Sequence, residues 1–138
     1  MSVEPMEYVA PKFELKAGRI AEIPFYATVP AASQLTILSD MITFPFIVRN
    51  ILIDFGADHL DAVLHYVLLS TSRTTSVTAV PADTNAFSGL SPIGYAIGDN
   101  REKRYYPNIE WRETKSFIKV HAVNNNAYAV NIKVTVTI

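Results

Sequence analysis

The last ten residues of the chain alternate between apolar and polar side chains, and this pattern constrains the fold more than any other feature. Every second residue from Val130 to Ile138 is a β-branched apolar residue, and asparagine, lysine and threonine occupy the positions between them. A period of two with β-branched side chains is typical of a strand that has one buried face and one solvated face. The pattern therefore predicts a C-terminal strand in a sheet that covers a core.

The remainder of the chain has the composition of one β domain. Its 138 residues are enough to bury a core, and the absence of cysteine excludes disulfides and thiolate metal sites. Hydrophobic residues make up 49% of the chain, which excludes disorder, and eight prolines disfavour long helices. Short apolar segments recur roughly every 8–12 residues. We therefore expect an all-β protein: a single-domain, antiparallel, jelly-roll-like β-sandwich of about eight strands over residues 12–138, after an extended N-terminal arm over residues 1–11.

Two positions predict irregularities in this sandwich. Pro24 interrupts the pattern of a strand that begins near Arg19, which places that strand at a sheet edge or at a bulge. Within the apolar segment 42–55, the hydrophobic residues change parity near Arg49 and Asn50. The change of parity predicts a bulge or a crossing of the chain between two sheets.

Residues 62–70 fit two structures. They form either a helix with Asp58 as its N-cap or a strand that is buried on both faces. The β character of the surroundings and the lack of a glycine C-cap favour the strand. Residues 71–92 are rich in Thr, Ser, Ala and Pro, and their length indicates a functional or partner-contacting loop. A return to β character is expected over residues 93–97, and a short strand over residues 12–16.

Charge and targeting signals limit the possible partners. Twelve basic and 13 acidic residues give a net charge of −1, which predicts no binding to nucleic acid or to anionic lipid. The N-terminus lacks the pattern of a signal peptide, and the segment 42–55 is too short and too polar for a membrane span. We therefore expect a protein that is made in the cytoplasm and has no membrane partner.

The densest group of possible metal ligands consists of Asp54, Asp58, His59 and Asp61, whose oxygen donors suit calcium. EF-hand spacing is absent, so a polar loop with turn hydrogen bonds is the favoured interpretation. His65 lies in an apolar run, where a core or interface histidine with one satisfied nitrogen is expected. His121 falls on the outward parity of its strand. No ligand spacing joins these two histidines, so no metal site is predicted.

No catalytic constellation is evident either. Ser91 is followed by Pro92, which blocks the helix that a nucleophile elbow requires. Glu110 and Glu113 stand beside basic residues and are explained as paired surface charges. We therefore expect no enzyme, no catalytic residues and no cofactor. The run from Arg101 to Arg104 is expected to be a solvated hairpin.

An aromatic group is the strongest hint of ligand binding. It comprises Tyr95, Tyr105, Tyr106 and Trp111. Exposed aromatic rings serve as stacking platforms in sugar-binding sandwiches, whereas buried ones fill a core or a subunit interface. The interface or core interpretation is favoured, and carbohydrate binding stays open if Trp111 or Tyr106 is exposed.

The order of features from Phe44 onward resembles the small jelly-roll structural proteins of tailed-phage particles. The resemblance covers about two thirds of the chain and weakens over residues 1–40. Its motifs are Phe44-Pro45-Phe46, Ile51-Leu52-Ile53, Gly94-Tyr95 with Gly98-Asp99-Asn100, and Phe117-Ile118-Lys119-Val120-His121-Ala122 with Asn124 and the alternating C-terminal strand.

This resemblance implies a virion structural protein, of the head-decoration or minor capsid type, that works without a cofactor on the particle surface. It implies a symmetric oligomer, with a trimer favoured, that binds the major capsid protein or another virion protein. We expect residues 1–12 and the loop 71–92 to carry these contacts. The alternative is a carbohydrate-binding or receptor-binding sandwich module.

Overall fold

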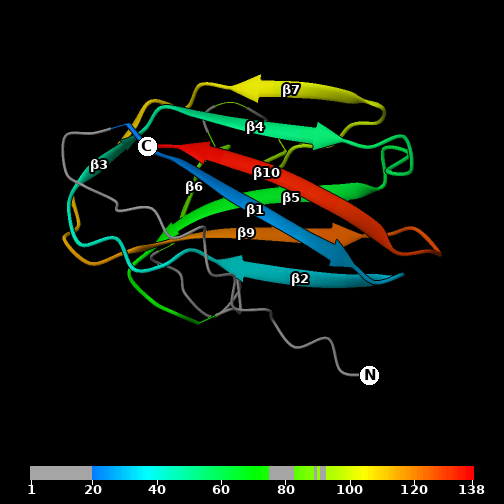
Figure 1. The fold of residues 1–138 in the computed structure, drawn as a ribbon, viewed down its shortest axis with the longest axis horizontal. Coiled ribbons are helices and arrows are strands. Elements are labelled where there is room, and N and C mark those ends of the chain that lie inside the picture. Colours follow the sequence, from blue (N-terminus) through cyan, green and yellow to red (C-terminus); the bar gives the residue numbers. More distant parts are fainter. Residues whose placement is uncertain (1–19, 75–82, 89, 91–92) are drawn as a thin grey trace.

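The computed structural model describes residues 20–74, 83–88, 90 and 93–138, and within these ranges it contains strands and no helix (Figure 1). The described residues form ten strands: β1 (Glu22–Val29), β2 (Ser33–Leu38), β3 (Phe46–Val48), β4 (Asn50–Phe55), β5 (Val63–Ser70), β6 (Thr84–Asn85), β7 (Arg101–Tyr105), β8 (Ile109–Trp111), β9 (Phe117–Asn124) and β10 (Val130–Thr137). Three of them are only two or three residues long, which accounts for the excess over the expected eight.

Two four-stranded antiparallel sheets form the body of the protein. The first, called here the β10 sheet, has the order β1-β10-β4-β7, and the second, the β9 sheet, has the order β2-β9-β5-β6. In Figure 1, β1 and β10 cross β9 and β5 obliquely. The inner faces of the two sheets share one hydrophobic cluster, to which Phe25 and Ile53 contribute from the β10 sheet and Val67 and Val120 from the β9 sheet. The predicted all-β sandwich is therefore confirmed, and the jelly-roll connectivity stays a prediction.

The C-terminal strand has the predicted alternation. In β10 the apolar residues from Val130 to Val136 are buried at every second position, and Asn131 and Lys133 between them are exposed. The strand lies inside the β10 sheet, between β1 and β4. Its hydrophobic stripe therefore faces the core, while its polar stripe lies on the outer face of the sheet.

Both predicted irregularities are present. β1 is an edge strand of the β10 sheet and pairs only with β10. Pro24 has no backbone N–H to donate, and at an edge no second strand requires one. The parity change at Arg49 is a crossing between sheets, because β3 pairs with β8 in a separate two-stranded ribbon and β4 pairs with β10 and β7. The backbone N–H of Arg49 donates to the carbonyl of Thr137 at 2.8 Å and fixes this crossing.

The ambiguous segment 62–70 is a strand, as favoured. β5 pairs with β9 along its whole length, from Val63 opposite Asn124 to Ser70 opposite Phe117. Its last four residues are all buried, so both faces of the strand are covered there. The helical periodicity of this segment is the coincidental result of burial on both faces.

Two local expectations are wrong. Residues 93–97 form no strand, and only an isolated bridge joins Ala96 to His65, because Gly94 takes a left-handed backbone with φ of 74° that interrupts an extended chain. The run Arg101–Arg104 is exposed as expected, but it forms no hairpin; it belongs to β7, which pairs with β4 at the sheet edge. Its charges protect that edge from further pairing. The expected arm and the strand at 12–16 lie outside the described residues.

The sandwich has two distinct ends. The hairpin end holds the β9–β10 turn (residues 125–129) and the loop 56–62 between β4 and β5. The ribbon end holds the β3–β8 ribbon and the C-terminal Ile138, which lies near β3 in Figure 1. Each candidate site below belongs to one end or to the outer face of one sheet.

Candidate functional site

The possible calcium ligands do not come together. Asp54 lies on the outer face of the β10 sheet between Lys133 and Glu102 of the neighbouring strands. Asp58 and Asp61 are exposed in the loop 56–62, whereas the ring of His59 in the same loop is fully buried. Within the described part of the chain no three His, Asp or Glu side chains form a group that could hold a metal ion. These residues are loop and strand positions, without a shared centre.

His65 is in the core, but the expected satisfied nitrogen is missing. Its ring is fully buried, and neither ring nitrogen has a hydrogen-bond partner among the described residues. The ring packs against Phe55 at 5.3 Å and against the ring of His59 at 5.4 Å between centroids. The expectation is corrected because the inner face of β5 at this position meets aromatic and apolar side chains instead of a hydrogen-bonding group.

His121 has the predicted outward parity, yet it is only 5% exposed. Its Nδ1 lies 2.7 Å from Thr36 Oγ1, and its Nε2 lies 3.0 Å from Gln34 Oε1. Burial lowers the pKa of the His121 imidazole below its usual value, since the charged form loses solvation. The ring of Tyr66 lies 5.7 Å from that of His121 and 5.5 Å from that of Tyr95. The outer face of the β9 sheet therefore carries a row of polar and aromatic side chains.

A buried ion pair adjoins this row. Lys119 occupies the outer face of β9, two residues before His121, and its Nζ lies 3.1 Å from Asp83 Oδ2. The Lys119 side chain is fully buried and that of Asp83 is 5% exposed. The second carboxylate oxygen, Oδ1, has no hydrogen-bond partner in the described residues. Removing two charges from water costs several kcal/mol per ion, which only close pairing offsets.

The pair and the row were not found from the sequence. The alternation of β9 places Lys119 and His121 on the same outward face, which is a usable signal. Outward parity normally indicates solvent, however, and nothing in the sequence shows that this face is buried. Asp83 stands in a long loop, where no pattern predicts its partner.

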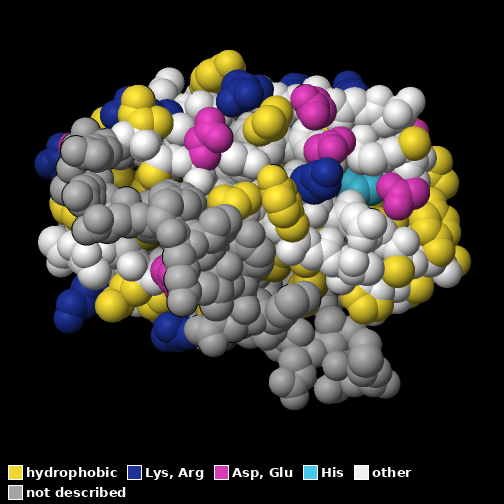
Figure 2. Space-filling model, viewed as in Figure 1, with side chains coloured by type: hydrophobic (Ala, Val, Ile, Leu, Met, Phe, Trp, Pro, Cys, Tyr) yellow, Lys and Arg dark blue, Asp and Glu magenta, His cyan; other side chains and the backbone are white. Residues whose placement is uncertain are grey.

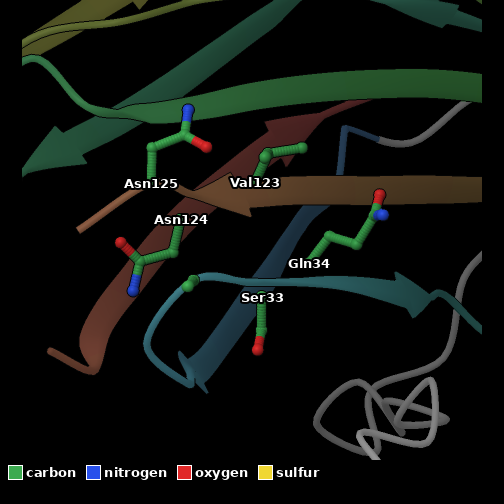
Figure 3. Close-up of a pocket in the computed structure, with 6 residues that line it drawn as sticks. Ser33, Gln34, Val123, Asn124 and Asn125 are labelled. Atoms are coloured by element: carbon green, nitrogen blue, oxygen red, sulfur yellow. The ribbon is translucent and has the colours of Figure 1, made fainter. Parts of the chain in front are cut away.

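A groove of about 220 Å³ lies where β2 begins and β9 ends (Figure 3). The exposed side chains of Gln34 and Asn125 reach solvent beside it, so amide donors and acceptors are available. Asn124 is already used by the fold, since its Nδ2 donates to the carbonyls of Tyr128 at 2.8 Å and Pro30 at 3.1 Å. The lining residues are Ala32, Ser33, Gln34, Val123, Asn124 and Asn125. Such a groove suits hydrogen bonds to a polar ligand.

The predicted aromatic group is dispersed over the molecule. Tyr95 contacts Tyr66 on the β9 sheet, while Tyr105 packs against Phe87 at 5.0 Å and its pKa is raised by burial. Trp111 is half-buried beside the hydrophobic cluster, as the core interpretation requires. Tyr106 is 59% exposed. The sequence grouped these residues by proximity in the chain, and the fold separates them.

Three exposed hydrophobic side chains lie at the ribbon end, and two others, Leu60 and Tyr128, lie in the loops of the hairpin end. Ile47 projects from the β3–β8 ribbon opposite Glu110, and Tyr106 follows β7 in the loop that leads to β8. Ile20 precedes Ala21, whose backbone pairs with Ile138. These side chains are between 39% and 69% exposed. Isolated exposed apolar residues are ordinary, but several at one end of a domain mark a contact surface.

The charged candidates are surface groups. Glu110 pairs with Arg112 at 3.2 Å, and both side chains are well exposed, so the pair contributes little to stability. Figure 2 shows acidic, basic and hydrophobic side chains intermixed on the face it presents. This mixture agrees with the net charge of −1. Ser91 and Pro92, which were considered for hydrolase chemistry, lie outside the described residues.

The chain matches no protein-family model, no curated protein and no solved structure. Its function must therefore be argued from these surfaces alone.

The described residues include no helix that is long and apolar enough to cross a membrane.

Proposed function

We propose that this protein is a non-enzymatic structural protein of a virus particle, of the capsid-decoration or minor capsid type, that binds the particle surface as a symmetric oligomer. The observation that supports it is the set of exposed hydrophobic side chains at the ribbon end, which includes Ile20, Ile47 and Tyr106. They stand on a rigid sandwich whose core is separate from them.

The ribbon end is suited to protein partners for a physical reason. Burying apolar side chains of this size is favourable by about 1.5–3 kcal/mol each when they leave water completely. Aromatic and long aliphatic residues are enriched at the centres of protein interfaces. The paired charges of Glu110 and Arg112 on β8 would then lie at the rim of such an interface.

Oligomerisation strengthens weak contacts of this kind. A trimer presents three copies of each contact, so that the second and third contacts form at a high effective concentration. We assign the particle contacts to residues 1–12 and to the loop 71–92, as the sequence predicts; most of these residues lie outside the described ranges. In a virion that carries this chain, deletion of residues 2–11 is expected to release it from the particle without unfolding the sandwich.

Light scattering coupled to size exclusion tests the oligomer. The expected mass is about three times the 15.3 kDa of the chain. Tyr106→Lys is expected to shift the protein toward monomer, because it places a charge among the apolar side chains of the ribbon end. Tyr26→Lys is the matched control, since Tyr26 is similarly exposed on the outer face of the β10 sheet. A wild-type protein that stays monomeric at high concentration contradicts the proposal.

A second candidate is carbohydrate binding at the groove of Gln34 and Asn125. Its support is the polar lining of that groove, where the amide side chains of Gln34 and Asn125 are exposed. A glycan array with wild-type protein and with Gln34→Ala tests it. Binding that Gln34→Ala abolishes would favour the recognition module, and an absence of signal would remove this candidate.

A further inference from the structure

Two histidines are buried against each other at the hairpin end. His59 comes from the loop 56–62 and His65 from the inner face of β5, and both are fully buried. Their ring centroids lie 5.4 Å apart. The ring of Phe55 meets both of them edge-on, at 6.3 Å from His59 and 5.3 Å from His65. Neither histidine belongs to the surfaces on which the proposed function rests.

The pair lacks the hydrogen bonds that charged imidazoles need. His59 Nε2 lies 3.0 Å from the carbonyl of Asn131, so this nitrogen carries the proton and donates. His59 Nδ1 and both nitrogens of His65 have no partner among the described residues. The carbonyls of Ala96 and Val63 approach His65 and favour its charged form slightly, without forming a well-aligned hydrogen bond. An uncompensated imidazolium in this position is costly.

The electrostatic consequence for His65 is large. Burial, and after it the neighbouring His59, lower the pKa of His65 to about 4, and the two backbone carbonyls oppose this shift. At neutral pH the ring of His65 is therefore uncharged. Burial of the His59–His65 pair is favourable only while the ring of His65 is uncharged.

His59 also holds the loops of the hairpin end together. Its ring joins the loop 56–62 to β10 through Asn131, and its backbone carbonyl accepts a hydrogen bond from Asn126 Nδ2 at 3.1 Å. The hydroxyl of Tyr128 donates to the carbonyl of Asp58 at 2.6 Å. Gly56 leaves room for this arrangement, since a Cβ there would lie 2.6 Å from Asp58 Oδ1. Three segments of the chain thus meet around one imidazole.

We propose that His65, buried against His59, makes the hairpin end an acid-sensitive clasp, which holds its loops closed while the ring of His65 is neutral and releases them when that ring takes up a proton. Three charged groups adjoin the pair. Asp58 Oδ1 lies 3.9 Å from His59 Nε2 and is half-exposed, Asp99 accepts from the backbone N–H of Leu60, and the guanidinium of Arg101 stacks on Phe55. The positive charge of Arg101, which lies over the ring of Phe55, disfavours a second positive charge on the buried ring of His65.

The sign of the pH dependence follows from the lowered pKa. The folded pKa of His65 lies below its unfolded value of 6.5, so the unfolded chain takes up the proton first as the pH falls. The stability due to neutral His65 is complete above pH 6.5 and is lost progressively between 6.5 and about 4. Between pH 8 and pH 5 the unfolding equilibrium constant is expected to rise roughly 30-fold from this residue alone.

Urea denaturation of the full chain at pH 8 and pH 5 measures this change. In His65→Leu the roughly 30-fold contribution is expected to disappear, while stability at pH 8 stays equal or increases because no unpaired polar ring is left buried. His121→Asn is the comparison variant, since it removes another buried histidine from the opposite face of the β9 sheet; it is expected to keep the roughly 30-fold contribution of His65 and to lose only the contribution of His121 itself. An unchanged pH dependence in His65→Leu overturns the proposal.

Two further measurements can be made on the wild-type chain, and the variant His59→Gln adds a comparison to the first of them. In NMR titration the ring of His65 is expected to remain neutral below pH 5, and in His59→Gln it should titrate at higher pH because the neighbouring imidazole is gone. Hydrogen exchange, corrected for the intrinsic pH effect, should lose protection first over residues 56–62 and 125–131. A His65 that titrates near 6.5, or equal loss of protection over the β3–β8 ribbon, overturns the proposal.

Discussion

The outer faces of the two sheets differ sharply. On the outer face of β10, Asn131 and Lys133 are exposed, and Thr137 at the end of the strand is the outward residue of β10 that is buried. In β9, by contrast, residues on both faces are buried, including Lys119 and His121 on the outer side. Side chains alternate between the two faces in both strands, but of the two strands only β10 has a burial pattern that follows this alternation.

The difference shows at which positions the replacement of a polar residue should destabilise the fold. Polar groups on the β10 sheet exchange freely with water, so their replacement costs little. Polar groups on the β9 sheet have specific partners, namely Asp83 for Lys119 and both Thr36 and Gln34 for His121. Loss of one partner leaves the other buried without compensation.

The largest expected effect is at the buried ion pair. Lys119→Met leaves the carboxylate of Asp83 buried and unpaired, and it is expected to reduce the free energy of unfolding by about 3–5 kcal/mol. The double variant Lys119→Met with Asp83→Val should recover most of this loss, because an apolar pair of similar volume has no charge to solvate. Urea denaturation measures both variants. A single variant as stable as wild type would show that the pair is open to solvent.

A matched pair of variants in β10 sharpens the comparison. Ile132→Ala removes a fully buried side chain and is expected to cost about 2–5 kcal/mol. Lys133→Ala, at the next position on the solvated face, should change stability by no more than about 0.5 kcal/mol. Thermal or urea unfolding distinguishes the two. Equal costs for Ile132→Ala and Lys133→Ala would mean that the outer face of the β10 sheet is also covered.

A smaller effect than those at Lys119 and Ile132 is expected at His121. His121→Asn shortens the side chain, so that the contacts to Thr36 and Gln34 are weakened, and it is expected to lower the free energy of unfolding by about 1 kcal/mol at pH 8. The folded pKa of His121 lies below its unfolded value, so its contribution is present above the unfolded pKa and is lost as the pH falls. The variant should therefore lose less stability on acidification than wild type. An acid profile that is identical to that of wild type would show that His121 does not titrate during unfolding.

Local patterns predicted several elements correctly. Pro24 indicated an edge strand or a bulge, and the strand is at the edge; the parity change near Arg49 indicated a bulge or a crossing between sheets, and the chain crosses; residues 62–70 were correctly taken as a strand. Each prediction depended on interactions between residues close in sequence, such as the missing N–H of proline. The error at residues 93–97 arose because β-forming side chains were counted while the left-handed backbone of Gly94 was not.

The candidate sites were predicted less well, for a different reason. His65 was placed in the core correctly, but its empty hydrogen-bond environment depends on Phe55 and His59, which meet it only in the folded sandwich. Proximity in sequence grouped Asp54 with Asp58, and the fold puts the first on a sheet face and the second in an end loop.

The sequence by itself determined that this protein is an antiparallel β-sandwich, because strand alternation is a local property that hydrophobic burial enforces along each strand. It did not determine which outer face is dry, nor that Lys119 would meet Asp83 or His59 would meet His65. Lys119 and Asp83 lie 36 residues apart in the chain, and the rings of His59 and His65 are brought together by the packing of the loop 56–62 against the inner face of β5. The burial and pairing of polar side chains are properties of that packing, so only the tertiary structure decides which polar groups are buried and which partners they have.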